Sequence, residues 1–159
     1  MLFHTLLRAF GRMRQVMDGY FAQYGISGPQ WAVLSILHRA EQEGKSSLRL
    51  TDLGQRLLIQ PPSVTGVIDR IERQGLVRRL ASQTDLRSRH VSLTDQGRQL
   101  VERVLPGRAQ QIRSLFAGLS EPERAGLTST LEKLESQLGQ LASDAARTVR
   151  TKGPEPAEE

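Results

Sequence analysis

Arginine is the residue type in this chain that points most directly to a binding chemistry. Eight arginines lie between residues 49 and 91, and they account for most of the net charge of +5. Guanidinium groups bind phosphate oxygens and the edge of guanine, so the segment predicts nucleic-acid binding, with a solvated charged face as the alternative. The arginines are Arg49, Arg56, Arg70, Arg73, Arg78, Arg79, Arg87 and Arg89.

Catalytic and metal chemistry have no comparable support. The chain has no cysteine, which excludes disulfides and thiolate metal sites. His4, His38 and His90 have no second histidine or acidic ligand at metal-binding spacing on the same helix. A Ser/His/Asp set, a paired-carboxylate motif and a glycine-rich phosphate loop are also missing at useful spacing. We therefore predict that the protein is not an enzyme and holds no cofactor and no metal.

A helix that could present arginines to DNA is predicted for residues 61–74, opened by Pro61-Pro62 and ended by Gly75. Its apolar face follows the i, i+3, i+4, i+7 spacing of an amphipathic helix and consists of Val64, Val67, Ile68 and Ile71. The opposite face has short side chains near its N-terminus and arginines behind them, a shape that fits the major groove. That face consists of Pro62, Ser63, Thr65, Gly66, Asp69, Arg70 and Arg73.

Individual side chains on this face suggest different contacts. The hydroxyls of Ser63 and Thr65 can hydrogen-bond to bases or phosphates, and Arg70 can reach guanine. Asp69 faces a polyanion awkwardly, so it either accepts a hydrogen bond from a cytosine amine or pairs with a neighbouring arginine. The residues placed nearest the DNA backbone are Gln60, Pro62 and Arg73.

The neighbouring segments complete a helix-turn-helix that is followed by a hairpin. Thr51 is predicted to cap a short helix over residues 52–58. Three short strands are predicted over residues 47–50, 76–82 and 90–93. The last two strands are joined by a polar loop, with Val91 and Leu93 on the inner side. This is the element order of a winged helix-turn-helix, so the predicted fold is mainly α with a small β-wing.

Two amphipathic helices precede this unit. The first, over residues 2–24, carries an apolar stripe at helical spacing and begins too near the N-terminus for much chain to cover it. Burial against a partner subunit would cover that stripe. In the second helix, Ser27 and Gln30 form a capping box, and Trp31 begins the inward face.

Two further helices follow the wing. Thr94 caps a helix over residues 95–119, in which Pro106-Gly107 predicts a kink or a local break. Ser120 opens another capping box, and the last helix carries leucines at intervals of four and three, a heptad seam typical of helix pairing. Helices over residues 2–24 and 95–148 are the predicted dimerisation elements. Their predicted contact residues are Phe3, Leu7, Phe10, Leu127, Leu131, Leu134, Leu138 and Leu141.

The length of 159 residues predicts one domain, residues 1–150 with a winged core at about 47–94, followed by a disordered acidic tail at 151–159. No run approaches the roughly 18 apolar residues of a membrane span. No basic-then-apolar signal sequence opens the chain. We expect a soluble, cytoplasmic protein.

Three stretches resemble the MarR family of bacterial transcriptional regulators. They read LTDLGQRL, PPSVTGVIDRIERQGLVRR and TDLRSRHVSLTDQG. The third is similar to the wing signature of the family, with an Asp, an Arg two residues later, then Leu-Thr and a Gly three residues on. Here these positions are Asp85, Arg87, Leu93, Thr94 and Gly97. The likeness covers roughly residues 2–146.

The resemblance implies a homodimer that binds a pseudo-palindromic operator in double-stranded DNA and is released by a small, often aromatic and anionic, effector. It implies that Arg87 enters the minor groove while Asp85 orients it. Arg89 either contacts phosphate or remains solvated, and Arg87 has the same solvated alternative. The effector would bind between the dimerisation helices and the DNA-binding lobe, where the candidates are Arg14, Tyr20, Tyr24, Trp31 and His38. Ordinary helix packing is the alternative for these residues.

A second class of function fits the same elements less well. In it, the winged fold is a protein–protein interaction module without specific DNA binding, and the leucine seam recruits a partner. The arginine-rich loop argues against this interpretation.

Overall fold

The computed structural model describes the backbone of residues 1–57, 63–81 and 89–151, and side chains as far as residue 144. Four predicted site residues, Gln60, Pro62, Asp85 and Arg87, lie outside the described residues, as does nearly all of the predicted tail. The chain divides into two compact units, Met1–Leu115 and Phe116–Glu159. The extent of the predicted domain therefore stays a prediction.

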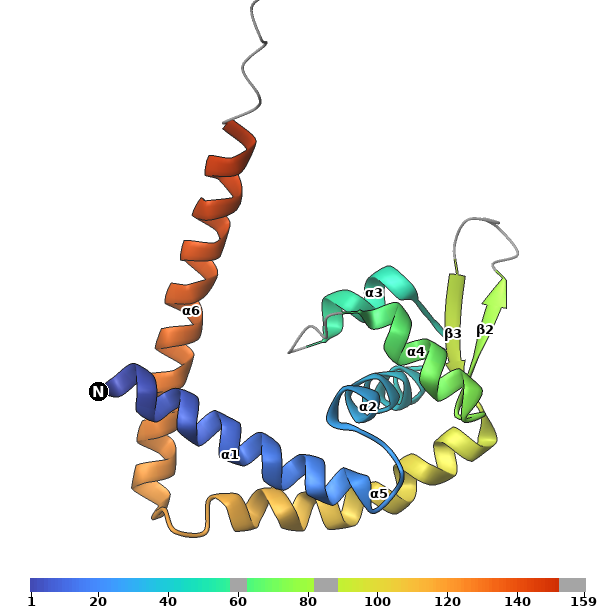
Figure 1. The fold of residues 1–159 in the computed structure, drawn as a ribbon, viewed down its shortest axis with the longest axis horizontal. Coiled ribbons are helices and arrows are strands. Elements are labelled where there is room, and N and C mark those ends of the chain that lie inside the picture. Colours follow the sequence, from blue (N-terminus) through green and yellow to red (C-terminus); the bar gives the residue numbers. More distant parts are fainter. Residues whose placement is uncertain (58–62, 82–88, 152–159) are drawn as a thin grey trace, which may run out of the picture. The chain divides into compact units, whose positions relative to one another are not determined.

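The first unit is mainly helical with a small antiparallel sheet, which confirms the predicted fold class (Figure 1). The strand order β1-β3-β2 places the third strand in the middle. The sheet and α4 lie at the end of the unit opposite to the N-terminus. The elements are α1 (Leu2–Ala22), α2 (Gly28–Gln42), β1 (Leu48–Arg49), α3 (Leu50–Arg56), α4 (Val64–Arg73), β2 (Val77–Ala81), β3 (Arg89–Leu93) and α5 (Asp95–Leu115). We call residues 47–94 the winged lobe.

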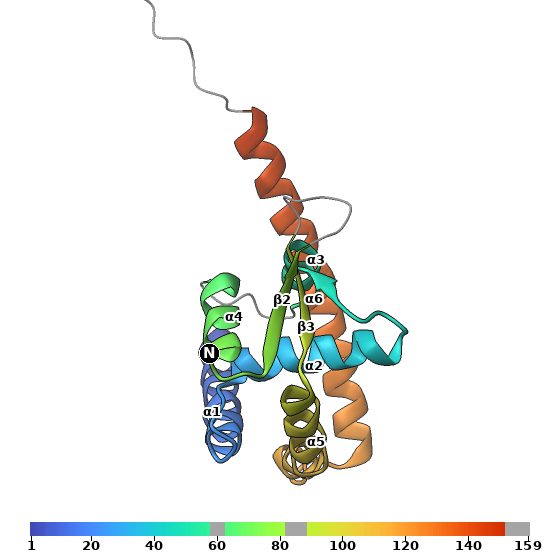
Figure 2. The same ribbon diagram turned by 90° about the vertical axis from the view of Figure 1, so that its right-hand side faces the viewer.

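The winged lobe packs against α2, and the two share one core. Trp31, Leu34 and Leu37 are buried there, as their spacing predicts. They belong to one cluster with the inner face of α4 and the inner side of the sheet, which includes Val91. Figure 2 shows α4 beside the β2–β3 hairpin. The apolar face of α4 is thereby covered, and its opposite face is left open.

Both helices of the helix-turn-helix begin at positions other than those predicted. The helix predicted over residues 52–58 with Thr51 as its cap is α3, which begins at Leu50 directly after β1 and has no side-chain cap. The next helix begins at Val64, and Pro61 and Pro62, which were predicted to open it, lie outside the described residues. Ser63 has extended backbone angles, and its Oγ accepts the Gly66 amide at 2.9 Å. Ser63 therefore supplies the acceptor that starts the helix.

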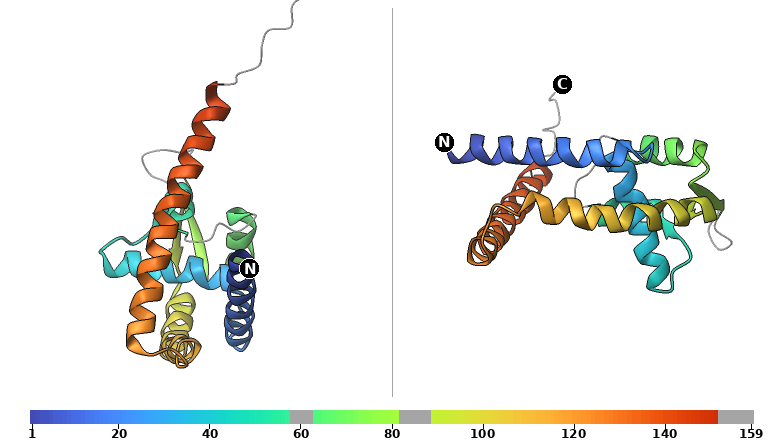
Figure 3. Two further views of the ribbon diagram at one scale, coloured as in Figure 1. Left: turned by 90° about the vertical axis from the view of Figure 1, so that its left-hand side faces the viewer. Right: turned by 90° about the horizontal axis from the view of Figure 1, so that it is seen from below.

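Helices α1 and α5 lie alongside each other, and α2 lies across them (Figure 3). A kink or a local break was predicted at Pro106-Gly107. The local break is wrong because α5 continues through Pro106, and the axis of the helix bends along its length. Pro106 has no amide to donate. Close to it, the buried Tyr20 hydroxyl donates to the Val104 carbonyl at 2.7 Å, and the Arg108 main-chain amide bonds to the same hydroxyl. A side chain inserted into the helical ladder is a recognised cause of bending.

The predicted end of α5 at residue 119 is also wrong. The helix ends at Leu115 and is followed by a turn in which the Leu119 amide donates to the Phe116 carbonyl at 3.1 Å. The second unit contains α6 (Glu121–Thr151). At its start, the Ser120 amide donates to Glu123 Oε2 at 2.8 Å, as the capping box predicts, and the Ser120 hydroxyl donates to the same oxygen at 2.6 Å. The Ser27–Gln30 box is complete in both directions.

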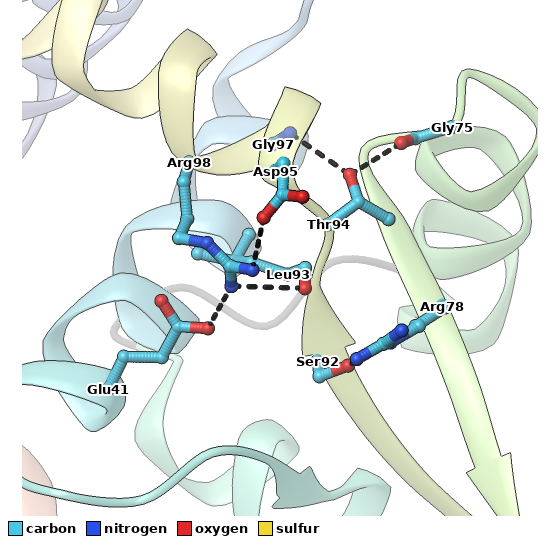
Figure 4. A network of polar contacts seen from close by, with 9 residues as sticks. All are labelled: Glu41, Gly75, Arg78, Ser92, Leu93, Thr94, Asp95, Gly97 and Arg98. Atoms are coloured by element: carbon cyan, nitrogen blue, oxygen red, sulfur yellow. Dashed lines mark hydrogen bonds and ion pairs between the residues drawn. The ribbon is translucent and has the colours of Figure 1, made fainter.

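The Leu93-Thr94-x-x-Gly97 segment joins the winged lobe to α5 (Figure 4). The Thr94 hydroxyl accepts the Gly97 amide at 3.0 Å, as expected of a cap, and donates to the Gly75 carbonyl at 2.6 Å. A Cβ atom on Gly97 would lie 2.0 Å from the Leu76 carbonyl oxygen, which is why this close approach needs glycine. The end of α4 and the start of α5 therefore share one packed joint.

Arg98 extends this joint to α2. Its guanidinium donates to Glu41 at 2.6 Å and to Asp95 at 2.7 Å, and also to the Leu93 carbonyl. The bond that Arg98 donates to Asp95 raises the pKa of Arg98 most strongly, and Glu41 raises it further. Among the helices that the structure describes, none combines the length and apolar character needed to cross a membrane.

Candidate nucleic-acid interface

The open face of α4 carries the polar side chains predicted for it. Ser63, Thr65, Arg70 and Arg73 are exposed, and Gly66 is half-buried. The Ser63 Oγ already accepts one hydrogen bond as the helix cap, but its hydroxyl hydrogen remains available for a donor role. The Arg73 Nε donates to the Asp69 carbonyl of its own helix at 3.3 Å. The N-terminal half of α4 therefore presents short donors, and arginines follow.

Asp69 pairs with an arginine, which was one of the two roles predicted for it; the other was a hydrogen bond from a cytosine amine. The partner is Arg79 of β2, which also pairs with Glu72. The Arg79 amide donates to Glu72 Oε1 at 3.1 Å, and the Arg79 side chain is 22% exposed. The hydrogen bond that Arg79 donates to Asp69 and the charge of Glu72 raise the pKa of Arg79 against the opposing effect of burial. This contact ties α4 to the wing and offsets part of the negative charge of two carboxylates near the open face of α4.

Sequence reasoning missed this role of Arg79, although the strand pattern contains a signal for it. Val77 is buried in β2, and Arg79 lies two residues later, on the same face of the strand. An arginine on an inward face requires carboxylate partners. Glu72 and Asp69 lie one turn apart on α4 and supply them.

The described part of the wing has a continuous ladder. β2 pairs with β3 from Val77↔Leu93 to Ala81↔Arg89. Arg89 is exposed at the first position of β3, where a phosphate contact or solvation is possible. Within the hairpin, the Nε of Arg78 in β2 donates to the Oγ of Ser92 in β3 at 3.2 Å.

Comparisons with known proteins agree with this geometry. A sequence profile of the MarR family matches residues 24–88. The HTH-type transcriptional regulator MhqR of Bacillus subtilis (strain 168) is 30% identical over 134 residues, which cover 84% of this chain and 88% of the relative. The chain belongs to the MarR family.

Two solved structures of MarR-like architecture extend the comparison. The S. aureus MepR–DNA complex is 26% identical with a TM-score of 0.77, covering 86% of this chain and 98% of that chain. A structure of Bordetella bronchiseptica BpsR, described as showing regulation of DNA binding by 6-hydroxynicotinic acid, is 28% identical with a TM-score of 0.72. It covers 84% of this chain and 98% of that chain.

The effector candidates of this MarR-family chain lie in different surroundings. Tyr20 and Trp31 are buried in the core, and Tyr24 is partly buried against it. Trp31 stacks on Phe21 with ring centroids 5.5 Å apart. Arg14 is exposed and pairs with Asp18 at 3.4 Å. The packing contacts account for the aromatic residues, and whether they also bind an effector stays a prediction.

One side chain near these aromatics was not anticipated. The Arg108 guanidinium carbon lies 5.7 Å from the centroid of the Trp31 ring. Its Nε is buried without a hydrogen-bond partner among the described residues. His38 resembles it, with Nδ1 buried and unpartnered and Nε2 3.0 Å from Gln42 Nε2. Over the described ranges, no group of three or more His, Asp or Glu side chains could hold a metal ion.

The predicted dimerisation residues are large apolar side chains left open on this single chain. On α1, Phe3 is 66% exposed, and Leu7 and Phe10 are exposed as well. On α6, the whole heptad seam is exposed. It consists of Leu127, Leu131, Leu134, Leu138 and Leu141.

Proposed function

We propose that the protein is a sequence-specific regulator of transcription that binds double-stranded DNA as a homodimer, represses at a pseudo-palindromic operator and is released by a small effector. The observation that carries the proposal is the open face of α4, fixed to the wing through Arg79 and presenting small donors followed by arginines. A helix of this kind fits the major groove, and in this proposal the β2–β3 hairpin beside it contacts the adjacent groove. Operator binding implies a cytoplasmic location, and no enzymatic activity is part of the proposal.

The roles of single residues in this proposal follow their exposure and type. Ser63, Thr65 and Arg70 read base edges, and the small Gly66 permits a close approach. Asp85 orients Arg87 in the minor groove, where the negative potential favours arginine. The proposed backbone contacts are Gln60, Pro62, Arg73 and Arg89.

The homodimer is supported by the open apolar surfaces of α1 and α6. A second copy would bury Phe3, Leu7, Phe10 and the leucine seam. Two winged lobes would then meet two half-sites about one helical turn, 10–10.5 base pairs, apart.

The effector is supported by the relative BpsR, whose DNA binding is regulated by an aromatic acid. We propose that an anionic aromatic molecule binds near Arg14, Tyr20, Tyr24, Trp31 and His38. Such a ligand releases the operator only if it binds better to a conformation whose lobes no longer match the half-site spacing.

The test begins with selection of bound fragments from genomic DNA, followed by gel-shift titration of the selected operator. Wild type should bind it far more tightly than an unrelated duplex, with affinity falling steeply as salt rises. Arg87→Ala should weaken binding and reduce the preference at minor-groove positions. Arg103→Ala, which removes the same charge from an exposed position on α5, should bind like wild type.

Equal binding of Arg87→Ala and wild type would remove Arg87 from the interface. A protein–protein interaction module would show no preferred duplex and salt-insensitive binding to its partner. Repression itself is measured by transcription in vitro from the selected promoter, where an activator would raise the yield of transcript.

A further inference from the structure

The winged lobe contains a hollow that none of the proposed contacts uses. It has a volume of about 360 Å³ and lies beside the edge strand β1. Its walls come from the segment between α2 and β1, from β1 itself, from α3 and from the wing strand β3. The side chains that matter to its chemistry are Lys45, Ser47, Arg49, Asp52, Arg56 and His90.

The hollow is positively charged, because three of these side chains are cations and one is a carboxylate. The Arg49 side chain has no hydrogen bond or ion pair among the described residues. Arg56 and Lys45 share one carboxylate of Glu43, at 3.5 and 3.9 Å. Their side chains are 35% and 52% exposed, and long, exposed pairs of this kind contribute little. The side chains of Arg49, Arg56 and Lys45 can therefore form ion pairs with an anion that binds in the hollow.

Polar groups without full partners line the same walls. Ser47 Oγ lies 3.2 Å from His90 Nδ1, while His90 Nε2 is buried without a partner among the described residues. The Asp52 carboxylate already accepts the Thr51 hydroxyl at 3.4 Å. Hydroxyl and basic side chains are the groups that proteins use to hold phosphate oxygens.

The position of the hollow indicates which anion would reach it. Helix α3 is the first helix of the helix-turn-helix, and in this architecture the first helix crosses the DNA backbone while the second enters the major groove. His90 directly follows Arg89 in β3, and Arg89 is a proposed contact to the DNA backbone. We propose that the hollow binds a phosphate of the operator backbone, held chiefly by Arg49 with Lys45 and Arg56. This inference rests on the proposed function.

The first test is the salt dependence of operator binding by Arg49→Ala. Loss of one phosphate contact should lower the slope of log K against log salt by about 0.9 for duplex DNA. Affinity should fall by a similar factor for the operator and for an unrelated duplex, because a backbone contact carries no sequence information. Arg103→Ala is the matched control and should keep the wild-type slope.

The second test looks for a gain, which misfolding cannot produce. Glu43→Gln removes the carboxylate that competes for Lys45 and Arg56, so operator binding should tighten several-fold. Glu102→Gln makes the same charge change at an exposed position on α5. It should tighten binding less, because only the general charge changes.

Unchanged salt slopes in Arg49→Ala, with Glu43→Gln no tighter than Glu102→Gln, would overturn the inference. Calorimetry with inorganic phosphate tests the alternative that the hollow binds free phosphate and not a phosphate of the DNA backbone. Binding of free phosphate that Arg49→Ala abolishes, without any change in its DNA slope, would also overturn it. Failure of the proposed function would give a different result from failure of this inference, because the wild-type protein would then bind no duplex preferentially.

Discussion

The winged lobe and the leucine seam of α6 use the same kinds of side chain in opposite ways. In the lobe, Leu53, Ile68 and Val91 are fully buried in a core that the chain completes by itself. On α6, Leu138 and Leu141 are 54% and 55% exposed. The first surface is buried within one chain, while the second is open in this chain and is the surface that we propose a second copy covers. Folding of the lobe and assembly of the protein are therefore separable properties.

The largest effect is expected when a charge is introduced into the open apolar seam of α6. Leu134→Asp should raise the dimer dissociation constant by about two orders of magnitude or more, because burying an unpaired carboxylate costs about 3 kcal/mol or more and each 1.4 kcal/mol is tenfold. Sedimentation equilibrium measures this constant. Ser136→Asp adds the same charge to α6 off the seam and should leave it unchanged. Equal effects of both variants would mean that the seam is not the dimer interface.

The next effect concerns the joint that closes the lobe. Gly97→Ala should destabilise the fold by about 3 kcal/mol, because overpacking costs about 1–3 kcal/mol and here the new methyl meets a main-chain oxygen. Urea unfolding of the variant gives this value. Gly126→Ala places a methyl on α6 with no atom within 4 Å and should stabilise its helix by about 0.5–1 kcal/mol. Wild-type stability of the Gly97→Ala variant would show that the joint can open.

A smaller effect should follow loss of the link between the recognition helix and the wing. Arg79→Gln should cost about 1.5–3 kcal/mol of stability, since a hydrogen bond to a charged group contributes about that much. It should also weaken operator binding, because Asp69 then faces the DNA unpaired. The neighbouring Arg78→Gln is the control. Adding Asp69→Asn to Arg79→Gln should restore part of the affinity in a gel-shift titration, and no recovery would argue against this explanation.

The last effect has no influence at neutral pH and is confined to alkaline solution. Burial raises the pKa of Tyr20 to about 12, whereas a tyrosine in the unfolded chain titrates near about 10. The neutral hydroxyl is thus favoured in the fold, so stability is unaffected below about pH 10 and falls as the pH rises toward 12. Urea unfolding at a series of pH values should show this fall in wild type and a weaker one in Tyr20→Phe. Identical profiles would show that Tyr20 ionises equally in both states.

Sequence reasoning succeeded where local periodicity decides the structure. The inward faces of α2 and α4, the cap at Thr94 and the Ser27–Gln30 box all follow from spacing that a short segment contains. It failed at Thr51, where β1 runs directly into α3 and leaves no separate capping position. At Pro106 it left a kink and a local break open, and the contact that accompanies the continuous, bent helix comes from Tyr20, a residue distant in sequence. The ion pairs of Arg79 and the hollow beside β1 likewise depend on tertiary contacts that no local pattern contains.

The Tyr20 hydroxyl makes α1 part of the main-chain hydrogen bonding of α5. A slide of α1 by one residue, about 1.5 Å along its axis, would break the 2.7 Å bond to the Val104 carbonyl. Gly107 makes room for the Tyr20 ring at this position, because a Cβ there would lie 2.5 Å from the hydroxyl. The two helices consequently have a fixed register, and the Phe3–Phe10 surface keeps one axial position relative to the helix that carries the winged lobe.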